Sequence, residues 1–425
     1  MKRTIFLSLM VLTALTSRAQ TLEECCNLAR EHYPEIRQYD LIAETEQYNI
    51  SNAARAWIPQ VVLSGQATYQ SATPTYPEAF NAMIAANGLD MSGIRKDQYK
   101  VAIDVSQNIW DGGQSKANRE IAEAEAAVER SRVDVSLYDL QSRIQNLYFG
   151  ILLLDERVEQ TETLIEVLDA NLNRMHTYYK NGVAMQSDVD AIEAELLTAR
   201  QTLGQVKASR ASFRRMLEVF IGRSLTDETL TRPAMVEVAS RTSLRPELAM
   251  FDAQSNKLVA QRKAITTSVM PRFSVFAQGY YGYPGLDMFK SMVSSEWTLN
   301  AIVGVRMSWN IGAFYTQKNN LSKLDAAERQ IAIQRDVFLF NTEMQTTQDA
   351  DEIVRLRSAL EDDNRIVELR RSVRMAAESR LENGVIDATD LLRKIADETT
   401  ATLNRSTHEI ELLQATYRLK TTLNQ

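Results

Sequence analysis

The sequence is poor in residues that cross-link or interrupt a chain. It has two cysteines, eight prolines and fifteen glycines in 425 residues. Cys25 and Cys26 are neighbours, and adjacent cysteines rarely bridge one another, so no disulfide framework is expected. The residues before Cys25 are larger than those of a lipoprotein signal, so lipidation is not expected either. Scarce proline and glycine favour long regular elements over a loop-rich fold.

The sequence also lacks an apolar run long enough to cross a membrane as a helix. Its most apolar stretch, residues 5–15, follows Lys2 and Arg3 and precedes a small-residue site at 17–19. This pattern is typical of a secretory signal peptide, whereas a membrane helix needs roughly 20 apolar residues. We therefore expect residues 1–19 to be removed on export and the mature chain to have no helical membrane span.

A net positive charge and the common catalytic motifs are lacking as well. The chain has 48 basic and 55 acidic residues, a formal net charge of −7, which argues against a nucleic-acid partner. The three histidines are scattered, and neither a metalloprotease helix motif, a phosphate loop nor a nucleophile elbow is present. Carboxylates on heptad helices usually form a solvated face. The sequence thus predicts neither an enzyme nor a cofactor or metal site.

What the chain does contain is a pattern that occurs twice. An Asn-Gly-Val turn is followed by an aspartate at fixed spacing in two places: Asn181, Gly182, Val183 and Asp188, and Asn383, Gly384, Val385 and Asp390. Other landmarks recur in the same order: Pro34-Glu35-Ile36 and Pro246-Glu247-Leu248, then Trp110-Asp111-Gly112-Gly113 and Trp309-Asn310-Ile311-Gly312. The pattern predicts an internal duplication, with repeats at 20–221 and 243–425 separated by an irregular collar at 222–242.

Each repeat contains long heptad segments. Apolar residues recur three and four positions apart from Leu137 to Tyr179, which indicates a coiled-coil helix over about 114–179, roughly 100 Å long. After the Asn-Gly turn, the same three-and-four spacing of apolar residues (the heptad seam) resumes over 187–221. The second half repeats this less cleanly, with expected helices at 316–380 and 387–425. Two heptad helices joined by a tight turn predict an antiparallel hairpin in each half.

Four stretches of about ten residues alternate between apolar and polar side chains. They are residues 60–70, 99–109, 272–282 and 298–309. A soluble antiparallel sheet with one solvated face would show the same alternation. The aromatic residues favour a membrane barrel, because all four tryptophans lie near strand ends, as in interfacial girdles: Trp57, Trp110, Trp297 and Trp309.

Four strands cannot close a barrel that holds water, and open sheet edges are not tolerated in lipid. Several copies of the chain must then share one barrel, and three copies supply twelve strands. The expected fold class is therefore mainly α with a membrane β-barrel part. In it, coiled-coil hairpins form an α-barrel, and four strands per chain contribute to a trimeric twelve-strand β-barrel.

With these features together, the sequence resembles the TolC family of bacterial outer-membrane efflux proteins. The resemblance covers nearly the whole mature chain and rests on the order of duplicated motifs: Thr21-Leu22-Glu23-Glu24, Tyr33-Pro34-Glu35-Ile36, Trp57-Ile58-Pro59, Trp110-Asp111-Gly112-Gly113 and the paired Asn-Gly-Val turns. It implies a homotrimer in the outer membrane of a Gram-negative bacterium with a long periplasmic extension. It also implies docking to a periplasmic adaptor and an inner-membrane transporter, and export of drugs, metals or proteins.

The resemblance also implies roles for the turns. The two Asn-Gly-Val segments would meet the adaptor, and Asp188 and Asp390 would form an acidic gate. The chain departs from the family's gate pattern at Arg393, which stands where the family can have a second acid, and a salt-bridge latch between Arg393 and a neighbouring acid is the alternative closure. Each role has a plain alternative, because glycine permits a tight turn and an aspartate near a helix start complements the helix dipole.

Two other functions stay open at the level of sequence. One is type I protein secretion, which differs from drug efflux mainly in its partners. The other is an outer-membrane coiled-coil spacer with no conducting path. A conducting lumen is favoured by the small and polar residues on one strand face: Ser64, Gln66, Thr68, Ser106, Asn108, Asn300 and Gly304.

Overall fold

The computed structural model describes residues 20–88, 93–225, 229–236, 242–383 and 385–425. The signal-peptide prediction at 1–19 and the prediction at Gly384 lie outside these residues. The chain divides into two compact units, and each combines segments from both halves of the sequence. The first comprises residues up to Tyr39, Ser131–Met250 and Gln334–Gln425, and the second Asp40–Arg130 and Phe251–Ile333.

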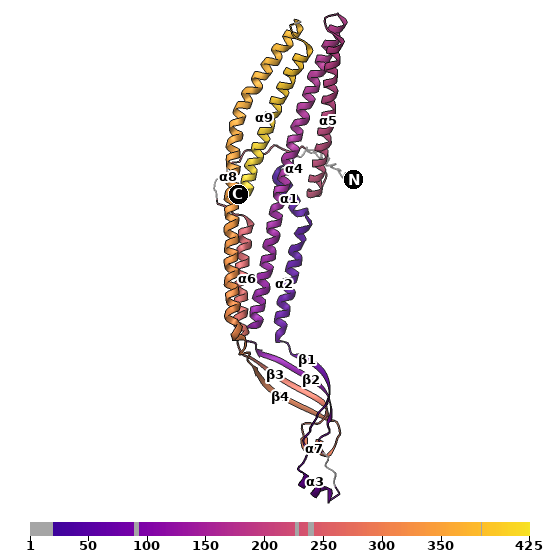
Figure 1. The fold of residues 1–425 in the computed structure, drawn as a ribbon, viewed down its shortest axis with the longest axis vertical. Helices are drawn as coiled ribbons and strands as arrows, with labels where there is room; N and C mark the ends of the chain where they lie inside the picture. Colours follow the sequence, from indigo (N-terminus) through magenta and orange to yellow (C-terminus); the bar gives the residue numbers. More distant parts are fainter. Residues whose placement is uncertain (1–19, 89–92, 226–228, 237–241, 384) are drawn as a thin grey trace, which may run out of the picture. The chain divides into compact units, whose positions relative to one another are not determined.

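Helices make up most of the described chain (Figure 1). The longer α-helices, each of three turns or more, are α1 (Leu22–His32), α2 (Gln38–Ala54), α4 (Gln114–Lys180), α5 (Gln186–Ile221), α6 (Pro246–Ser268), α8 (Ala313–Glu382) and α9 (Ala388–Leu423), and two short 3-10 helices are η1 (Pro34–Arg37) and η2 (Arg55–Trp57). Among described residues, no helix combines the length and apolar character of a membrane span. The predicted long helices are confirmed, and α4 and α8 are the longest, with 67 and 70 residues.

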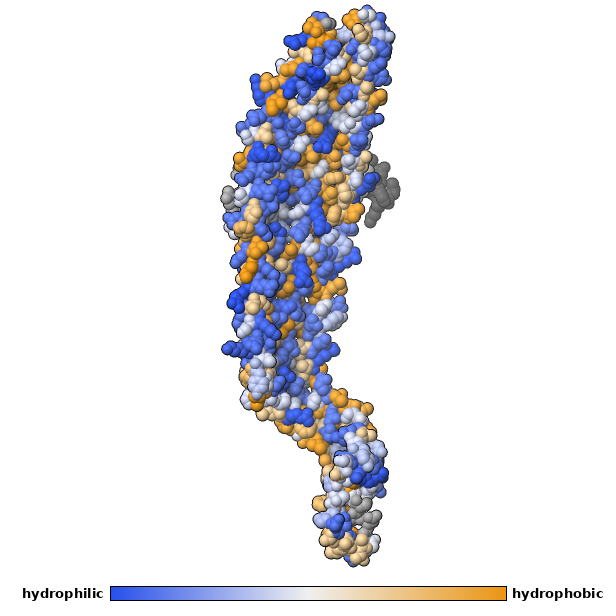
Figure 2. Space-filling view, in the orientation of Figure 1, coloured by the Kyte–Doolittle hydropathy of each residue, from blue (hydrophilic) through white to orange (hydrophobic). Residues whose placement is uncertain are grey.

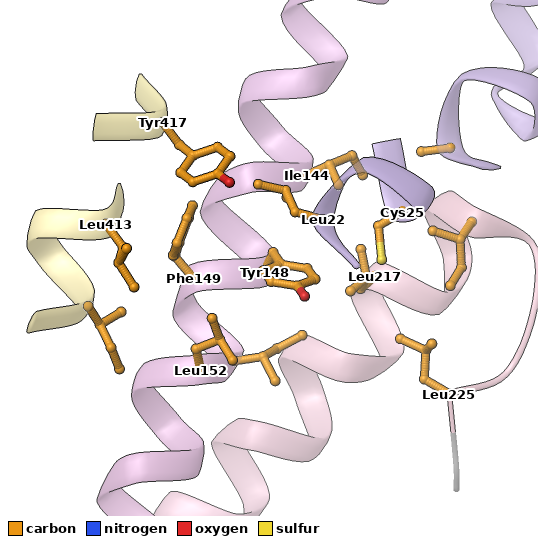
Figure 3. Packing of buried hydrophobic residues seen from close by; sticks show 14 of the residues in the cluster. Leu22, Cys25, Ile144, Tyr148, Phe149, Leu152, Leu217, Leu225, Leu413 and Tyr417 are labelled. Atoms are coloured by element: carbon orange, nitrogen blue, oxygen red, sulfur yellow. The ribbon is translucent and has the colours of Figure 1, made fainter. Parts of the chain in front are cut away.

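The main core of the first unit lies where α1, α4, α5 and α9 meet. Figure 3 shows Tyr148 and Phe149 of α4 between α1, α5 and α9. The residues of this cluster that are at most 5% exposed are Leu22, Cys25, Ala29, Leu140, Ile144, Tyr148, Phe149, Ile151, Leu217, Ile221, Leu225 and Ile410. The Tyr148 hydroxyl lies 2.8 Å from the carbonyl of Gln20 and 2.6 Å from that of Thr231, so it ties both segments to α4.

The core differs in one respect from the seam expected along α4. The heptad pattern places Leu147 in the seam, but Leu147 is only partly buried, while Tyr148 and Phe149 are fully buried. The reason is that α4 packs here against three helices on different sides, which requires an apolar face wider than a two-position seam. In the second half, Val373 of the expected seam is exposed, and Ala377 is buried nearby.

The α8–α9 hairpin holds a buried charged residue. Asp349 of α8 is fully buried and accepts hydrogen bonds from Arg418 (2.6 Å), Gln345 (2.9 Å) and Thr422 (3.2 Å). Three donors satisfy the carboxylate, which a buried charge requires. Next to this network, an apolar cluster that includes Leu356 and Leu423 joins the two helices.

The two cysteines lie in the first unit as thiols and are not joined in a disulfide. Cys25 belongs to the core cluster, and burial, assisted by the nearby Glu23 carboxylate, raises the pKa of the Cys26 thiol to about 12. Since the thiolate is the nucleophile, we expect the folded protein at pH 8 to react with iodoacetamide at Cys26 at least about a hundredfold more slowly than an exposed cysteine. Mass spectrometry after timed labelling measures this rate, with the urea-unfolded chain as the reactive control. Rapid labelling of the folded protein would contradict the burial of this thiol.

The second unit contains one antiparallel sheet in the order β1-β2-β3-β4. Its strands are β1 (Gln60–Tyr69), β2 (Asp97–Trp110), β3 (Arg272–Tyr283) and β4 (Thr298–Ser308), with short helices α3 (Glu78–Ala85) and α7 (Met288–Val293) between strands of each pair. The expected small four-stranded sheet within a mainly helical fold is thus confirmed. β2 and β3 are distant in sequence yet pair along their length, from Tyr99↔Tyr283 to Trp110↔Phe273.

The Trp-Asp-Gly-Gly motif is the turn from β2 into α4. The Asp111 carboxylate accepts hydrogen bonds from the backbone N–H groups of Gly113 (2.9 Å) and Ser115 (2.7 Å), which caps the helix. Gly112 has φ +71°, and a Cβ there would lie 2.6 Å from the Cβ of Met270. The motif therefore encodes a helix start that packs closely against the segment leading into β3.

Candidate functional site: the hairpin turns and the two-faced sheet

The turn after α4 is a Schellman motif. The N–H of Val183 donates to the carbonyl of Tyr178 (2.9 Å) and that of Gly182 to Tyr179 (3.0 Å). Gly182 has φ +74°, the left-handed conformation that this motif requires and that glycine adopts at no steric cost. After α8, the N–H of Val385 donates in the same way to the carbonyl of Arg380 (2.9 Å).

The returning helices begin at equivalent positions but are capped differently. The N-cap of α5 is Met185, and the carboxylate of Asp188 accepts a hydrogen bond from its N–H (2.9 Å). The N-cap of α9 is Asp387, whose carboxylate accepts from the N–H of Asp390 (2.8 Å). Asp188 is therefore engaged in capping, whereas the carboxylate of Asp390 has no hydrogen-bond or ion-pair partner in the described chain.

Asp390 and Arg393 both lie exposed on the first turns of α9. They are three residues apart, so they occupy neighbouring positions on the helix surface. Within the described residues neither forms an ion pair, and they do not pair with each other. The structure thus brings two opposite charges to one surface and leaves both available to a partner.

Beneath the turns, the two hairpins are packed against each other. Met175, Val189 and Ile192 of the first hairpin share a buried cluster with Ala388 of the second. A guanidinium adds polar contacts between the hairpins, because Arg174 of α4 forms a hydrogen-bonded ion pair with Glu382 of α8 (3.2 Å). The position of one turn is therefore coupled to that of the other.

The tips of the hairpins carry exposed apolar side chains. Val183, Met185 and Val385 are 72%, 73% and 69% exposed. Figure 2 shows hydrophobic residues at the surface of both tips. An apolar side chain that a tight turn exposes to solvent does not stabilise the fold of the single chain. Its exposure is typical of a surface that contacts a partner.

The sheet has one mainly apolar face and one mainly polar face. The register sets odd-numbered residues opposite one another, such as Leu63↔Ile103 and Val275↔Val305. The large apolar side chains on this face are exposed: Val61, Leu63, Val101, Ile103, Tyr281, Leu299, Val303, Val305 and Met307. The even-numbered face holds the polar set expected from the sequence together with Lys100, Asp104, Gln278 and Arg306.

The aromatic residues gather at the two ends of the sheet. Trp57, Trp110 and Trp309 lie at one end, where Trp110 contacts Phe273 (5.9 Å between ring centroids). Trp297 lies at the other end, with its ring centroid 6.2 Å from that of Tyr99 and 5.4 Å from that of Tyr281. All four tryptophans are partly exposed.

Both outer edges of the sheet are open in the single chain. Across the described residues, β1 pairs only with β2, and β4 only with β3. Their outward backbone groups, along strands of 10 and 11 residues, have no strand partner. Such long, apolar edges are templates for pairing with another chain.

Sequence reasoning missed several of these features. It selected the residues expected to line the lumen by their small polar side chains. It did not include the charged residues Lys100, Asp104 and Arg306, which lie on the same even-numbered face of the sheet. It treated Asp188 and Asp390 as equivalent, because the residues that decide their partners, Met185 and Asp387, lie outside the shared turn motif. No cluster of potential metal ligands occurs among the residues described by the structure.

Comparisons with known proteins agree with this architecture. The model of the outer membrane efflux protein family matches residues 25–223. The fold is similar to that of the outer membrane protein VceC from Vibrio cholerae, at 13% identity and a TM-score of 0.70, with 95% of each chain covered. No curated protein sequence matches the chain.

Two further solved structures have the same fold. One is the outer membrane channel CmeC of Campylobacter jejuni, at 10% identity and a TM-score of 0.67, with 95% of this chain and 85% of that chain covered. The other is the outer membrane channel MtrE of Neisseria gonorrhoeae in its open state, at 15% identity and a TM-score of 0.64, with coverage of 95% and 88%. At these identities the likeness establishes the shared fold.

Proposed function

Through residues 25–223 this chain belongs to the outer membrane efflux protein family, and we propose that it is the outer-membrane exit duct of a tripartite efflux pump. In this proposal, the mature chain is exported by its signal peptide and is not lipidated. Three copies form a channel in the outer membrane of a Gram-negative bacterium. A periplasmic adaptor joins the channel to an inner-membrane transporter, and small molecules leave through its lumen.

The observation that carries the proposal is the two-faced sheet with open edges. An apolar face flanked by aromatic residues suits lipid contact, with Trp57, Trp110, Trp297 and Trp309 at the membrane interfaces. Unpaired backbone groups are costly in lipid, so β4 of one copy would pair with β1 of the next. Three copies then close a twelve-strand barrel whose polar face lines water.

The helical hairpins would continue the conduit as a periplasmic α-barrel. The repeated Schellman bonds and the equivalent helix starts at Asp188 and Asp390 support an internal duplication of the module. The repeats at 20–221 and 243–425, with the collar at 222–242, stay a prediction. Asp188, Asp390 and Arg393 would form the constriction at the tip of this tube.

The decisive test is single-channel recording of the purified protein in a planar lipid bilayer. Discrete steps that favour cations are expected, because an aqueous path would pass an acidic tip. The mass of the detergent-solubilised protein should correspond to three copies. Because a closed tip would silence a true channel, the Asp188→Ala/Asp390→Ala variant is recorded in parallel. Silence from both proteins would overturn the channel in favour of a non-conducting coiled-coil spacer.

The turns Asn181, Gly182, Val183 and Asn383, Gly384, Val385 are the proposed adaptor-docking sites. We expect Gly182→Leu to abolish export while trimers persist. A Cβ at Gly182 meets open space, so the change blocks an approaching partner more than it disturbs the chain's own packing. The left-handed conformation adds a local cost of about 1–2 kcal/mol. Export is measured as drug accumulation in cells that carry the cognate pump.

The matched control is Gly182→Asn, because asparagine tolerates the left-handed conformation better than leucine and presents a smaller, polar side chain. Partial export by this variant, with no export by Gly182→Leu, would support docking. If Gly182→Leu removes the trimer from the membrane, the glycine serves only the turn.

A further inference from the structure

The charged residues of the sheet are few and lie mostly on one face. The strands contain Asp97, Lys100, Asp104, Arg272 and Arg306. Asp97 has the odd parity and is held by Arg95 through two hydrogen bonds of 3.1 and 2.7 Å. The other four have the even parity of the polar face, which thus carries three cations and one anion.

One cation and the anion of this face are tied together. The Gln278 amide donates to the Asp104 carboxylate and accepts from the Lys100 ammonium (3.4 Å). The same ammonium lies 4.9 Å from the centroid of the Tyr280 ring. Since the amide links opposite charges, the negative charge of Asp104 is largely balanced by that of Lys100.

The positive charge of Arg306 is not balanced by a carboxylate in the described chain. Its guanidinium carbon lies 4.7 Å from the centroid of the Phe276 ring, a cation–π contact that holds the group in place without reducing its charge. Gly304 makes room for that ring, because a Cβ at this position would lie 2.9 Å from two of its carbons. Throughout the described chain, no carboxylate forms an ion pair with Arg306 or Arg272.

From this arrangement we infer that the polar face of the sheet is an anion-preferring section of the conduit, with Arg306 on its Phe276 platform as the main selectivity residue. The inference rests on the proposed channel and specifies its solute chemistry. A water-filled passage lined by uncompensated guanidinium groups concentrates anions and depletes cations. The acidic tip has the opposite preference, so the two regions would favour ions of opposite sign. Solutes that carry a negative charge or a charge of each sign would be stabilised in the barrel section.

The test is the reversal potential of single channels under a gradient of potassium chloride, with chloride and potassium as the probes. Arg306→Gln is expected to lower the chloride-to-potassium permeability ratio roughly tenfold, because one charge about 6 Å from a permeating ion in water favours chloride about threefold and disfavours potassium about threefold. Adding Arg272→Gln should lower it further. Recording at low ionic strength limits screening, and the Asp390→Ala background removes the opposing filter at the tip.

Arg306→Lys is the matched control, because it keeps the charge and alters only the planar contact with Phe276. It should retain the parental permeability ratio. Conducting channels whose ratio is the same in Arg306→Gln and its parent would overturn the inference and leave the channel standing. Absence of conductance from the parent and the tip variants would instead overturn the channel and, with it, the inference.

Discussion

Asp390→Ala is expected to raise single-channel conductance severalfold. The carboxylate of Asp390 is exposed on the first turn of α9 beside Arg393, and within the described chain neither side chain has a partner. In a trimer, Asp390 of one copy can pair with Arg393 of the next and hold the tip closed. Removing the carboxylate abolishes that pair. The measurement is conductance in planar bilayers at fixed voltage and salt.

Two variants separate a latch from a simple charge effect. Arg393→Ala should also raise conductance, and it should increase cation preference because the acid remains. The exchange Asp390→Arg/Arg393→Asp should restore low conductance, since it reverses the pair without removing it. An unchanged conductance in both single variants would remove these residues from the gate.

The structure predicts a different outcome at Asp188. Because this carboxylate accepts a hydrogen bond from the Met185 N–H, Asp188→Ala removes a helix cap and should cost about 1 kcal/mol at the start of α5. We therefore expect most of the conductance increase of the double variant to come from Asp390. An equal contribution from Asp188 would show that capping does not occupy its carboxylate in the assembled protein.

Tyr148→Ala is expected to destabilise the first unit by about 3–5 kcal/mol, the range for a large aromatic residue lost from a packed core. Tyr148 is fully buried, and its hydroxyl bonds the backbone of Gln20 and Thr231. Burial raises its pKa above the ordinary value for tyrosine, so the hydroxyl stays protonated and able to donate at physiological pH. The unfolding midpoint in denaturant, followed by helical circular dichroism in detergent, measures the change.

Tyr148→Phe and Tyr179→Ala are the controls. Tyr148→Phe keeps the ring and removes the single hydroxyl proton that the carbonyls of Gln20 and Thr231 share, so about 1–3 kcal/mol should be lost. Tyr179 is a half-exposed tyrosine on the same helix, and its loss should change stability by less than about 0.5 kcal/mol. Equal effects of Tyr148→Ala and Tyr179→Ala would contradict the assignment of the core.

Most of the fold could be predicted because its signals are local and long. A heptad pattern from Leu137 to Tyr179 predicts the α4 helix whatever it packs against. Alternation over ten residues likewise predicts the strands. The exact buried set around Tyr148 and Phe149 could not be predicted, because it depends on three helices that approach α4 from distant parts of the chain. The exposure of Val373 has the same origin, since a periodic position is buried only where a neighbour covers it.

The candidate site likewise has features that the sequence predicts and features that only tertiary contacts decide. The motif positions the turns and the aspartates, since glycine alone readily meets the left-handed conformation at Gly182. Whether each aspartate is free depends on the residue that becomes the N-cap, and the repeat pattern does not include that residue. The basic character of the polar face could not be predicted from the sequence, because Lys100 and Arg306 come from different halves and only strand pairing puts them on one surface.

The sequence by itself determined the long helices, the two turns, the four alternating strands and the family resemblance. These follow from periodicity and backbone preference, which act over neighbouring residues. Only the tertiary structure decided which strands pair, that the charges of the sheet leave Arg306 uncompensated, and that Asp390 rather than Asp188 has a carboxylate available to a partner. Those properties arise from contacts between distant segments, where hydrogen bonds and burial act on side chains that are far apart along the chain.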